Sequence, residues 1–483
     1  MKLSLKFAAG PFGFLLLFFL PYPAPSPQAR LALAAFGWMI LWWMTQPVPW
    51  AIASLLPLVL FPVLGIATID KTVGLYGQTI FFWIWGTILM GYAMDRHGLA
   101  KRFALWFLSL PVIRRSTLRL VFGFMLVTAL ISTVISDAAT VAMMIPVGIS
   151  LVSFVRSIQG TPPGTKSNFG AFVSLGTLYG AAAGGTATIA GLPHNGLSLA
   201  LLEKFTGRAL GWFEWMKAGI PIFLLCLLAF FLILRLFLPL EMNRIPGGEK
   251  FLQDERRKLG SWTSGQRATL VIFLVMVVLL ILPTLLGFAL GPNHPLTQWS
   301  NTGLALNVVP PIVLLLLFCT PVNWAQGEFV LTWKETVAHS PWNILFMATS
   351  ATAVVGMLVE LGFAQLGGDL LAGWGLGRHS LPFAAAALVA FGTNFMPGAA
   401  ATSLFGSLLI PAAQQVGWNP TSMAILIPNV ALGIALPWAG AAAATVFAAG
   451  QIEMKEMMRI GIIATLVFAF LVAGIHILLA PVL

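Results

Sequence analysis

The chain contains little charge. Charged residues make up 8% of its 483 positions and hydrophobic residues make up 59%. A soluble globular protein carries about 25% charged residues. This number of charges cannot cover the surface of a water-soluble protein of this length. Most of the outer surface must therefore face lipid. The composition therefore excludes soluble enzymes, nucleic-acid-binding proteins and disordered scaffolds.

Cysteine and metal-binding patterns are also scarce. Cys226 and Cys319 lie inside long apolar runs, where cysteine is typically a small buried hydrophobic residue. The six histidines are scattered, and the chain has neither an H-E-x-x-H nor a C-x-x-C motif. A disulfide framework, a cofactor and zinc or thiol chemistry are therefore not expected.

The basic residues are concentrated in short segments. Lysine and arginine outnumber aspartate and glutamate by 26 to 15, but they lie in loops between apolar spans, so the excess indicates membrane orientation rather than a nucleic-acid partner. Asp95–Arg119 holds six basic residues against one acid, and Glu241–Arg267 holds six against four. Both are predicted to be cytoplasmic. Two segments on the same side of the membrane must be joined by an even number of crossings. Three candidate spans lie between these two, so one span must be non-crossing or doubly broken.

Apolar stretches of about 20 residues predict membrane-spanning helices. The first stretch follows Lys2 and Lys6 and resembles a signal peptide, but prolines follow it instead of a cleavage site, so a retained helix is expected. Two stretches are too short or too punctuated to span, which predicts re-entrant hairpins at 79–97 and 341–360. The candidate spans are 9–20, 31–45, 47–67, 120–155, 170–202, 218–240, 268–290, 303–320, 381–395, 403–417, 422–449 and 457–482.

The two halves of the chain share a similar spacing between a glycine and a later proline. Pro146 follows Gly98 by 48 residues, and Pro411 follows Gly362 by 49. Paired interruptions are typical of inverted-repeat transporters with a site near the bilayer midplane, although coincidence between apolar halves would give the same spacing. The predicted fold is an all-α polytopic membrane protein, with an N-terminal helix and lead-in at 1–30, a first repeat at 31–240, a cytoplasmic linker at 241–267 and a second repeat at 268–483.

Asp137 is the one ionisable residue in the 35 residues of Val121–Val155. Ser136 and Asp137 favour bonds to nearby backbone over a helix interior, so a broken helix is predicted over 120–155. The break would expose N–H groups that attract anions. An acid inside the membrane costs about 3 kcal/mol, so Asp137 is expected to face a cavity or a partner, whether or not it also caps the second half-helix.

Small residues interrupt another apolar span at 184–195. Glycine and proline here would free backbone carbonyl oxygens, which suit sodium. Close helix packing through small residues would produce the same pattern.

Motifs along the whole chain carry a family resemblance. They are Trp43–Pro49 with Ala53–Pro57, Ser136–Thr140 with Ala142–Pro146, Gly185–Asn195, Trp333–Glu335, and Leu436-Pro437 with Val446-Phe447. In this order they resemble the divalent anion:sodium symporter family, which carries dicarboxylates, citrate or sulfate. Ser136–Thr140 resembles its first Ser-Asn-Thr motif, and Gly185–Asn195 resembles its sodium loop.

The resemblance implies a homodimeric elevator-type carrier in the bacterial inner membrane, with about 11 transmembrane helices and two re-entrant hairpins. It implies Na+ as the coupling ion and a small anion, a di- or tricarboxylate or a sulfate-like oxyanion, as substrate. The sodium ligands carried over by position are Ser132, Ser136, Asp137, Gly191, Thr393, Gly398 and Ala439. The substrate-binding residues carried over are Ser136, Asp137, Ala138, Thr140, Leu192, Pro193, Asn195, Asn394, Gly398, Ala399, Thr402 and Ser403.

The chain departs from the family pattern at these positions. Asp137 replaces an asparagine, Ala138 a threonine, and Leu192 a serine or threonine. An ionised Asp137 would repel a dianion unless a cation lies between them or the acid is protonated.

The second repeat departs further. In the predicted broken segment 391–411, either Pro397–Ala399 or, counting back from Pro411, Ala401–Ser403 occupies the Ser-Asn-Thr position. In the predicted loop 436–450, Gly440–Ala443 replaces Thr-Pro-Pro-Asn. The second half-site has therefore lost most of its polar side chains.

The leading prediction is a sodium-coupled symporter of small anions that is not an enzyme. Four alternatives stay open: a proton-coupled or exchange carrier acting through Asp137, a carrier of a smaller or less charged anion, a channel, and an intramembrane hydrolase that uses Ser132 or Ser136 with His194 as base.

Overall fold

The computed structural model describes residues 3–77, 80–162, 165–291, 293–305, 308–340, 342–363, 377, 379–437 and 439–481. These residues are helical apart from loops and one antiparallel pair of short strands, β1 (Pro321–Asn323) and β2 (Glu328–Phe329). Six helices in this part are long and apolar enough to cross a membrane, which confirms a helical polytopic protein. They are contained in Ile69–Arg96, Asp137–Gln159, Trp212–Phe237, Ser264–Leu290, Trp342–Glu360 and Met454–Leu479.

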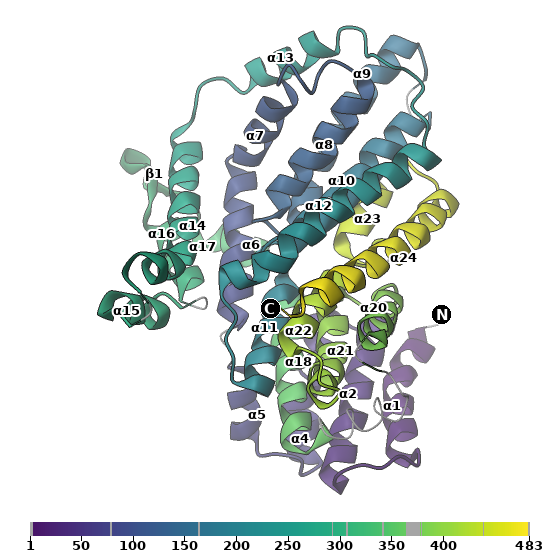
Figure 1. The fold of residues 1–483 in the computed structure, drawn as a ribbon, viewed down its shortest axis with the longest axis vertical. Helices are drawn as coiled ribbons and strands as arrows, with labels where there is room; N and C mark the ends of the chain where they lie inside the picture. The colour runs from purple at the N-terminus through teal and green to yellow at the C-terminus, as the bar shows by residue number, and fades with distance from the viewer. Residues whose placement is uncertain are drawn as a thin grey trace.

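The N-terminal helices form one end of the molecule, at the bottom of Figure 1. Helix α1 (Leu3–Phe19) packs along α2 (Pro27–Thr45), where the Trp42 indole donates to the Phe7 carbonyl at 3.2 Å. Short helices α3 (Trp50–Ala53), α4 (Leu56–Val63) and α5 (Ile69–Tyr76) follow.

The two predicted hairpins at 79–97 and 341–360 are wrong. Their described residues form single helices, α6 (Ile80–Arg96) and α18 (Trp342–Glu360). The glycines that punctuate α6 serve close packing instead of a turn: a Cβ at Gly86 would lie 2.6 Å from the Pro310 side chain. Membrane helices use small residues in this way to approach one another.

The first re-entrant hairpin is the segment that was predicted as a broken helix. Helix α8 (Thr117–Ser132) and α9 (Asp137–Gln159) flank a turn at 133–136, here called the first tip. The Thr117 N–H donates to the Asn243 carbonyl at 3.0 Å, and the Phe154 ring stacks on Phe251 at 4.3 Å. Both outer ends therefore lie beside the linker, at the top of Figure 1, which is the arrangement expected of a segment that does not cross.

A second hairpin enters from the opposite end of the molecule (Figure 1). Helices α20 (Ser380–Gly392) and α21 (Gly398–Gln415) flank a turn at 393–397, the second tip. Phe383, near the start of α20, contacts Phe470 near the C-terminus of α24 (Met454–Leu479), with ring centroids 5.2 Å apart. Phe395 at the tip shares a groove with Met458 near the start of α24, so α20 runs toward the middle of the protein.

Each hairpin packs on a helix that is itself interrupted. After α10 (Asn168–Thr186), residues 187–192 form the first loop before α11 (Pro193–Thr206) and α12 (Trp212–Phe237). The predicted span 170–202 is thus two helices. After α22 (Pro420–Val430), residues 431–437, 439 and 440 form the described part of the second loop before α23 (Ala441–Ala448). The second interruption lies earlier than the predicted 436–450 because the alanine-rich 441–448 favours helix.

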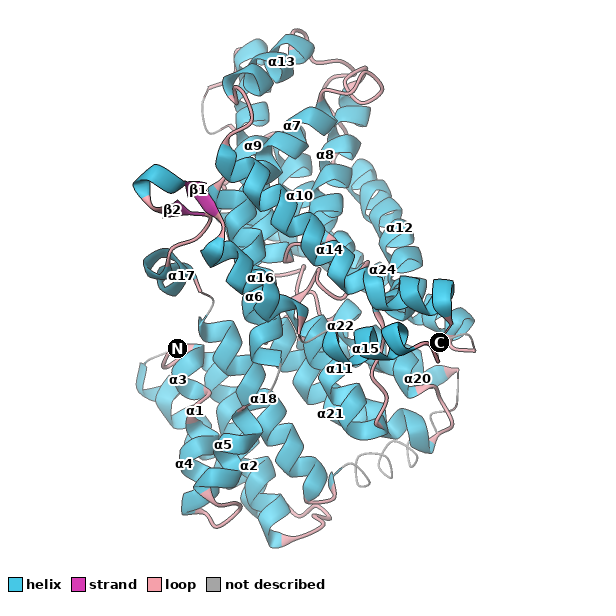
Figure 2. Cartoon of the chain, turned by 90° about the vertical axis from the view of Figure 1, so that its left-hand side faces the viewer, coloured by secondary structure: helices cyan, strands magenta, loops and turns pink. Residues whose placement is uncertain are grey.

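The remaining helices connect the halves. They are α7 (Leu99–Leu108), α13 (Gly248–Lys258) in the predicted linker, α14 (Ser264–Leu290), α15 (Pro295–Gly303), α16 (Val309–Cys319), the 3-10 turn η1 (Trp324–Gln326) and α17 (Trp333–His339). Figure 2 shows α13 at one end of the molecule and the strands with α17 along one side. Arg102 of α7 holds the end of the linker through hydrogen bonds to the carbonyls of Leu259 at 2.9 Å and Gly260 at 3.0 Å.

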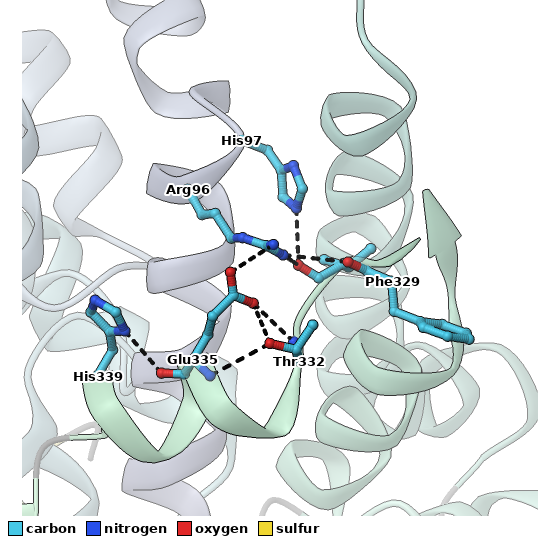
Figure 3. Close-up of polar contacts among 7 residues, drawn as sticks. Arg96, His97, Phe329, Thr332, Glu335 and His339 are labelled. Atoms are coloured by element: carbon cyan, nitrogen blue, oxygen red, sulfur yellow. Dashed lines mark hydrogen bonds and ion pairs between the residues drawn. The ribbon is translucent and has the colours of Figure 1, made fainter. Parts of the chain in front are cut away.

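A polar cluster joins the end of α6 to α17 (Figure 3). Arg96 pairs with Glu335 at 2.8 Å, and His97 Nε2 lies 3.0 Å from the Val330 carbonyl. Burial raises the pKa of Glu335, but hydrogen bonds from Thr332 and the Arg96 charge outweigh it, and the net pKa is lowered. Burial lowers the pKa of His97, so this ring favours its neutral form.

Candidate functional site

The first tip is followed directly by an acidic side chain. Ser136 caps α9 with extended backbone (φ −54°, ψ 145°), and its Oγ accepts from the Ala139 N–H at 3.4 Å. Asp137 Oδ1 accepts from the Ala138 N–H at 2.8 Å. In the part of the chain that the structure describes, no lysine, arginine or histidine pairs with Asp137. The positive end of α9 is therefore occupied by a side-chain carboxylate.

Hydroxyl and amide groups hold the first loop and bond it to the first hairpin. Ser132 Oγ donates to the Ala181 carbonyl at 2.7 Å, and the Thr188 hydroxyl donates to the Thr133 carbonyl. Asn195 Nδ2 donates to the Thr188 carbonyl at 2.9 Å. A Cβ at Gly191 would lie 2.8 Å from the Ser132 carbonyl, so glycine is required for this close approach. Ser132 and Gly191, both predicted sodium ligands, are thus brought together.

The other site residues predicted in the first half of the chain lie near the first tip or in the first loop, in different environments. Thr140 is buried one turn into α9, where its hydroxyl donates to the Ile135 carbonyl at 3.4 Å. Leu192 is fully buried and packs toward Gly185, so its side chain fills the loop instead of offering a polar group. Pro193 is the first residue of α11, and Ala138 lies in the first turn of α9.

The second tip repeats the backbone of the first with other side chains. Pro397 caps α21 with φ −59° and ψ 148° but supplies no side-chain hydrogen bond. Within the described residues, the N–H groups of Gly398, Ala399 and Ala400 have no hydrogen-bond partner. Thr393 lies four residues before this cap, as Ser132 lies four before Ser136. The positive end of α21 therefore carries N–H groups that no described side chain satisfies.

The sequence left open which residues of the second repeat occupy the Ser-Asn-Thr position, and the place of this helix break bears on that choice. Ala401, Thr402 and Ser403 lie inside α21, so the register that counts back from Pro411 is wrong. Thr402 and Ser403 are fully buried, and their hydroxyl groups have no partner among the described residues. Asn394 stays in the tip, where its Nδ2 donates to the Ala390 carbonyl at 2.7 Å.

His194 links the first loop to the second tip, a role that the sequence did not reveal. Its Nε2 lies 3.2 Å from the Pro428 carbonyl at the end of α22. A Cβ at Gly398 would lie 2.8 Å from the His194 ring and 2.4 Å from the Ala431 carbonyl. Its position directly after a glycine-rich loop and a proline was the available signal. Because an added Cβ at Gly398 would lie this close to Ala431, the family's asparagine cannot replace Gly398 unless the second loop moves.

Among its described residues, the second loop approaches the second tip through backbone atoms. Gly433 adopts φ 57°, and a Cβ there would lie 2.9 Å from the Ala439 carbonyl and 3.1 Å from the Thr393 carbonyl. Thr393 and Ala439, two predicted sodium ligands, thus lie on either side of Gly433. The Thr393 hydroxyl donates to the Ala390 carbonyl at 3.2 Å.

Comparison with known proteins gives a consistent picture. The family described as the sodium:sulfate symporter transmembrane region matches residues 3–483. The sodium-dependent dicarboxylate transporter SdcS of Staphylococcus saprophyticus is 27% identical, over 98% of this chain and 91% of the relative. SdcS of Staphylococcus aureus strain MRSA252 is also 27% identical, over 98% and 90%.

Two solved structures share the fold at low identity. MtrF of Neisseria gonorrhoeae, described among antimetabolite efflux pumps, has a TM-score of 0.54 and 14% identity, covering 97% of each chain. The YdaH transporter of Alcanivorax borkumensis has a TM-score of 0.54 and 15% identity, covering 95% of this chain and 99% of that one.

Proposed function

The chain belongs to the sodium:sulfate symporter family, and we propose that it moves a small anion across the membrane in symport with Na+. As a member of a transporter family it is a multi-pass protein of the bacterial inner membrane and not an enzyme, so the hydrolase alternative is wrong. The name of the SdcS relatives supports Na+ as the coupling ion and a dicarboxylate as the first substrate to test.

The opposite polarity of the two tips carries the proposal. The first tip ends in the Asp137 carboxylate, whereas the second tip ends in three N–H groups without a described partner. Carboxylate, hydroxyl and carbonyl oxygens suit a sodium ion, and a helix N-terminus suits an anion. A cation bound at Asp137 would also remove the repulsion between this acid and an incoming anion.

The first tip and loop bind Na+ in this proposal. The ligands are the carboxylate of Asp137, the hydroxyls of Ser132 and Ser136, and the carbonyl of Gly191. Ser132 uses its proton toward Ala181, which leaves its oxygen lone pairs free for a cation. Replacement of the family's asparagine by Asp137 adds a negative charge and strengthens cation binding there. Thr393 and the carbonyls of Gly398 and Ala439 form a weaker second cation position, because a single side-chain oxygen remains there.

The second tip binds one anionic end of the substrate. The N–H groups of Gly398 and Ala399 donate to its oxygens, and Asn394 supplies an amide N–H at the edge. Asn195 acts indirectly, because its amide donates to the Gly185 and Thr188 carbonyls and holds the first loop in shape. Pro193 and Leu192 lie across from the second tip, and Ala138 and Thr140 lie behind the first tip. Since alanine and glycine line this side, shape and backbone donors select the substrate more than side-chain charge does.

Transport follows an elevator mechanism in a homodimer. The two hairpins, with the interrupted helices α10–α11 and α22–α23, form the moving unit, and the two halves form an inverted repeat. Support comes from the entry of the hairpins at opposite ends of the molecule and from the buried contacts that join the two interrupted helices, including His194 to Pro428 and Ser198 to Ala424 at 2.5 Å.

Uptake by reconstituted vesicles tests this function. Labelled succinate, citrate, sulfate and a monocarboxylate are supplied outside vesicles with an inward Na+ gradient or an equal K+ gradient. We expect accumulation of at least one anion with Na+ only. Accumulation that ignores Na+ would exclude the sodium symport.

Proton coupling or anion exchange is the second candidate function, and the absence of a described basic partner for Asp137 favours it. A lone carboxylate in a membrane protein can carry a proton in place of a metal ion. Uptake driven by an imposed pH gradient without Na+, and abolished in Asp137→Asn, would support this mechanism over sodium symport.

A further inference from the structure

A groove of about 700 Å³ lies beside the first tip. One wall comes from α7, with Phe103 and Trp106, and the other from α14, with Leu270 and Phe273. The floor is the end of the first hairpin, including Val134. Phe103 is 38% exposed and Trp106 44% exposed, so the groove opens at the molecular surface.

The hydropathy and exposure of α14, which forms one wall, indicate what surrounds the groove. Helix α14 has a mean hydropathy of 3.0 in its most apolar window, and 17% of that window is buried inside the protein. A helix that is this apolar and this exposed faces lipid in a membrane protein. The groove therefore opens toward the hydrocarbon of the bilayer, where acyl chains are the available molecules.

One end of the groove is positively charged. Arg102 and Arg256 both line it, together with Trp262, and the Arg102 guanidinium lies 5.1 Å from the centre of the Trp262 ring. Arg102 donates to backbone carbonyls, which do not neutralise its charge. Within the described residues, neither arginine forms an ion pair.

The acids on the same helix do not compensate this charge. Glu249 pairs with Arg114 at 3.3 Å. Asp254 pairs with Arg257 at 4.0 Å, and Glu255 pairs with Lys258. Arg256 is thus left as a surplus charge at the mouth of an apolar groove, on a linker whose basic residues indicate the cytoplasmic side. The cytoplasmic leaflet is the one that presents anionic head groups, and basic pockets between membrane helices bind such lipids.

We infer that this groove is a binding site for an anionic phospholipid. One acyl chain lies between α7 and α14 against the first tip, and the phosphate lies between Arg102 and Arg256. Trp262 and Trp106 border the groove, and tryptophan favours the level of the lipid head groups. Because Val134 and Thr133 form part of the lining, the lipid contacts the hairpin that carries Asp137.

A second groove provides an internal comparison. It has a volume of about 730 Å³ and lies beside the second tip, with Phe395 and Met458 in its lining. It is apolar, and none of the described residues that line it is charged. It offers room for an acyl chain but nothing that distinguishes an anionic from a zwitterionic head group.

Native mass spectrometry of the full-length protein in non-ionic detergent tests the inference without depending on transport. Dioleoyl-phosphatidylglycerol and dioleoyl-phosphatidylcholine are added separately. Arg256→Gln is expected to weaken phosphatidylglycerol binding about fivefold and to leave phosphatidylcholine binding unchanged. Arg257→Gln is the matched control, because Arg257 is the next residue and carries the same charge but does not line the groove.

A filling variant separates the groove from the rest of the surface. Leu270→Trp places a larger side chain in the apolar wall and is expected to reduce binding of phosphatidylglycerol whatever its effect on transport. Equal losses in Arg256→Gln and Arg257→Gln would indicate general surface attraction and overturn the inference. Equal binding of both lipids by the unchanged protein, or full binding by Leu270→Trp, would overturn it as well.

Discussion

The two hairpin tips have nearly the same backbone and opposite chemistry. The cap residues Ser136 and Pro397 differ by only a few degrees, with φ −54° and ψ 145° against φ −59° and ψ 148°. At the first tip, side chains occupy the helix N-terminus. At the second, the N-terminus has no side-chain hydrogen bond. A helix break can thus be preserved as geometry while the side chains at the helix N-terminus change.

The tips are also stabilised by different interactions. The first loop is bonded to its tip through the Thr188 hydroxyl, and the Asn195 amide holds the loop itself. The second loop is fitted to its tip through Gly433 and Gly398, where backbone atoms approach too closely for any side chain. Polar substitutions should therefore affect the first tip most, and steric substitutions the second.

The largest effect is expected from Gly398→Asn, which restores the family's residue. Its Cβ would lie 2.4 Å from the Ala431 carbonyl, so the second loop must move. We expect loss of transport and a destabilisation of about 1–3 kcal/mol, measured by thermal unfolding in detergent. Gly440→Ala is the control, because nothing lies within 4 Å of its added Cβ. Normal stability and uptake in Gly398→Asn would show that the second tip tolerates a side chain.

The next effect is expected from Asp137→Asn at the first tip. Removal of the charge should raise the Na+ concentration for half-maximal uptake roughly tenfold, which corresponds to about 1.4 kcal/mol of lost cation binding. Sodium titration of uptake measures it, with Asp254→Asn on α13 as an acid outside the site. An unchanged Na+ dependence would remove the proposed polarity difference between the tips.

A smaller effect separates the two caps directly. Ser136→Ala removes the hydroxyl that accepts from the Ala139 N–H, and helix caps contribute about 1 kcal/mol. Pro397→Ala removes no side-chain hydrogen bond and should lower the melting temperature less. Equal shifts for the two alanine variants in thermal unfolding would mean that the Ser136 cap contributes nothing.

The smallest effect is expected from the Arg96–Glu335 pair, which lies outside both tips. The two side chains are 28% and 32% exposed, so loss of the pair in Glu335→Gln should cost less than about 1 kcal/mol. Because the pKa of Glu335 is lowered, its contribution is present above the unfolded-state pKa and is lost as pH falls through the folded-state pKa. Melting curves of both proteins should therefore converge in acid. A difference that persists at low pH would contradict the pairing.

Local composition alone located much of this architecture. Ser136 and Asp137 in an apolar run, and the glycines before Pro193, indicated where helices stop, because these residues compete with helical hydrogen bonding wherever they occur. The scarcity of charge identified a membrane protein, and the order of the motifs identified the family. Asp137 stood out because it is alone in its segment.

The direction of the chain after each break was decided by tertiary structure. The sequence predicted 120–155 as a broken helix and 79–97 as a hairpin, whereas the first returns to the linker and the described part of the second continues as α6. A break and a reversal have the same local composition, and the choice between them depends on which surfaces the two arms bury. The register of the second tip and the contact of His194 with Pro428 depend on atoms distant in sequence, so only the folded structure decides them.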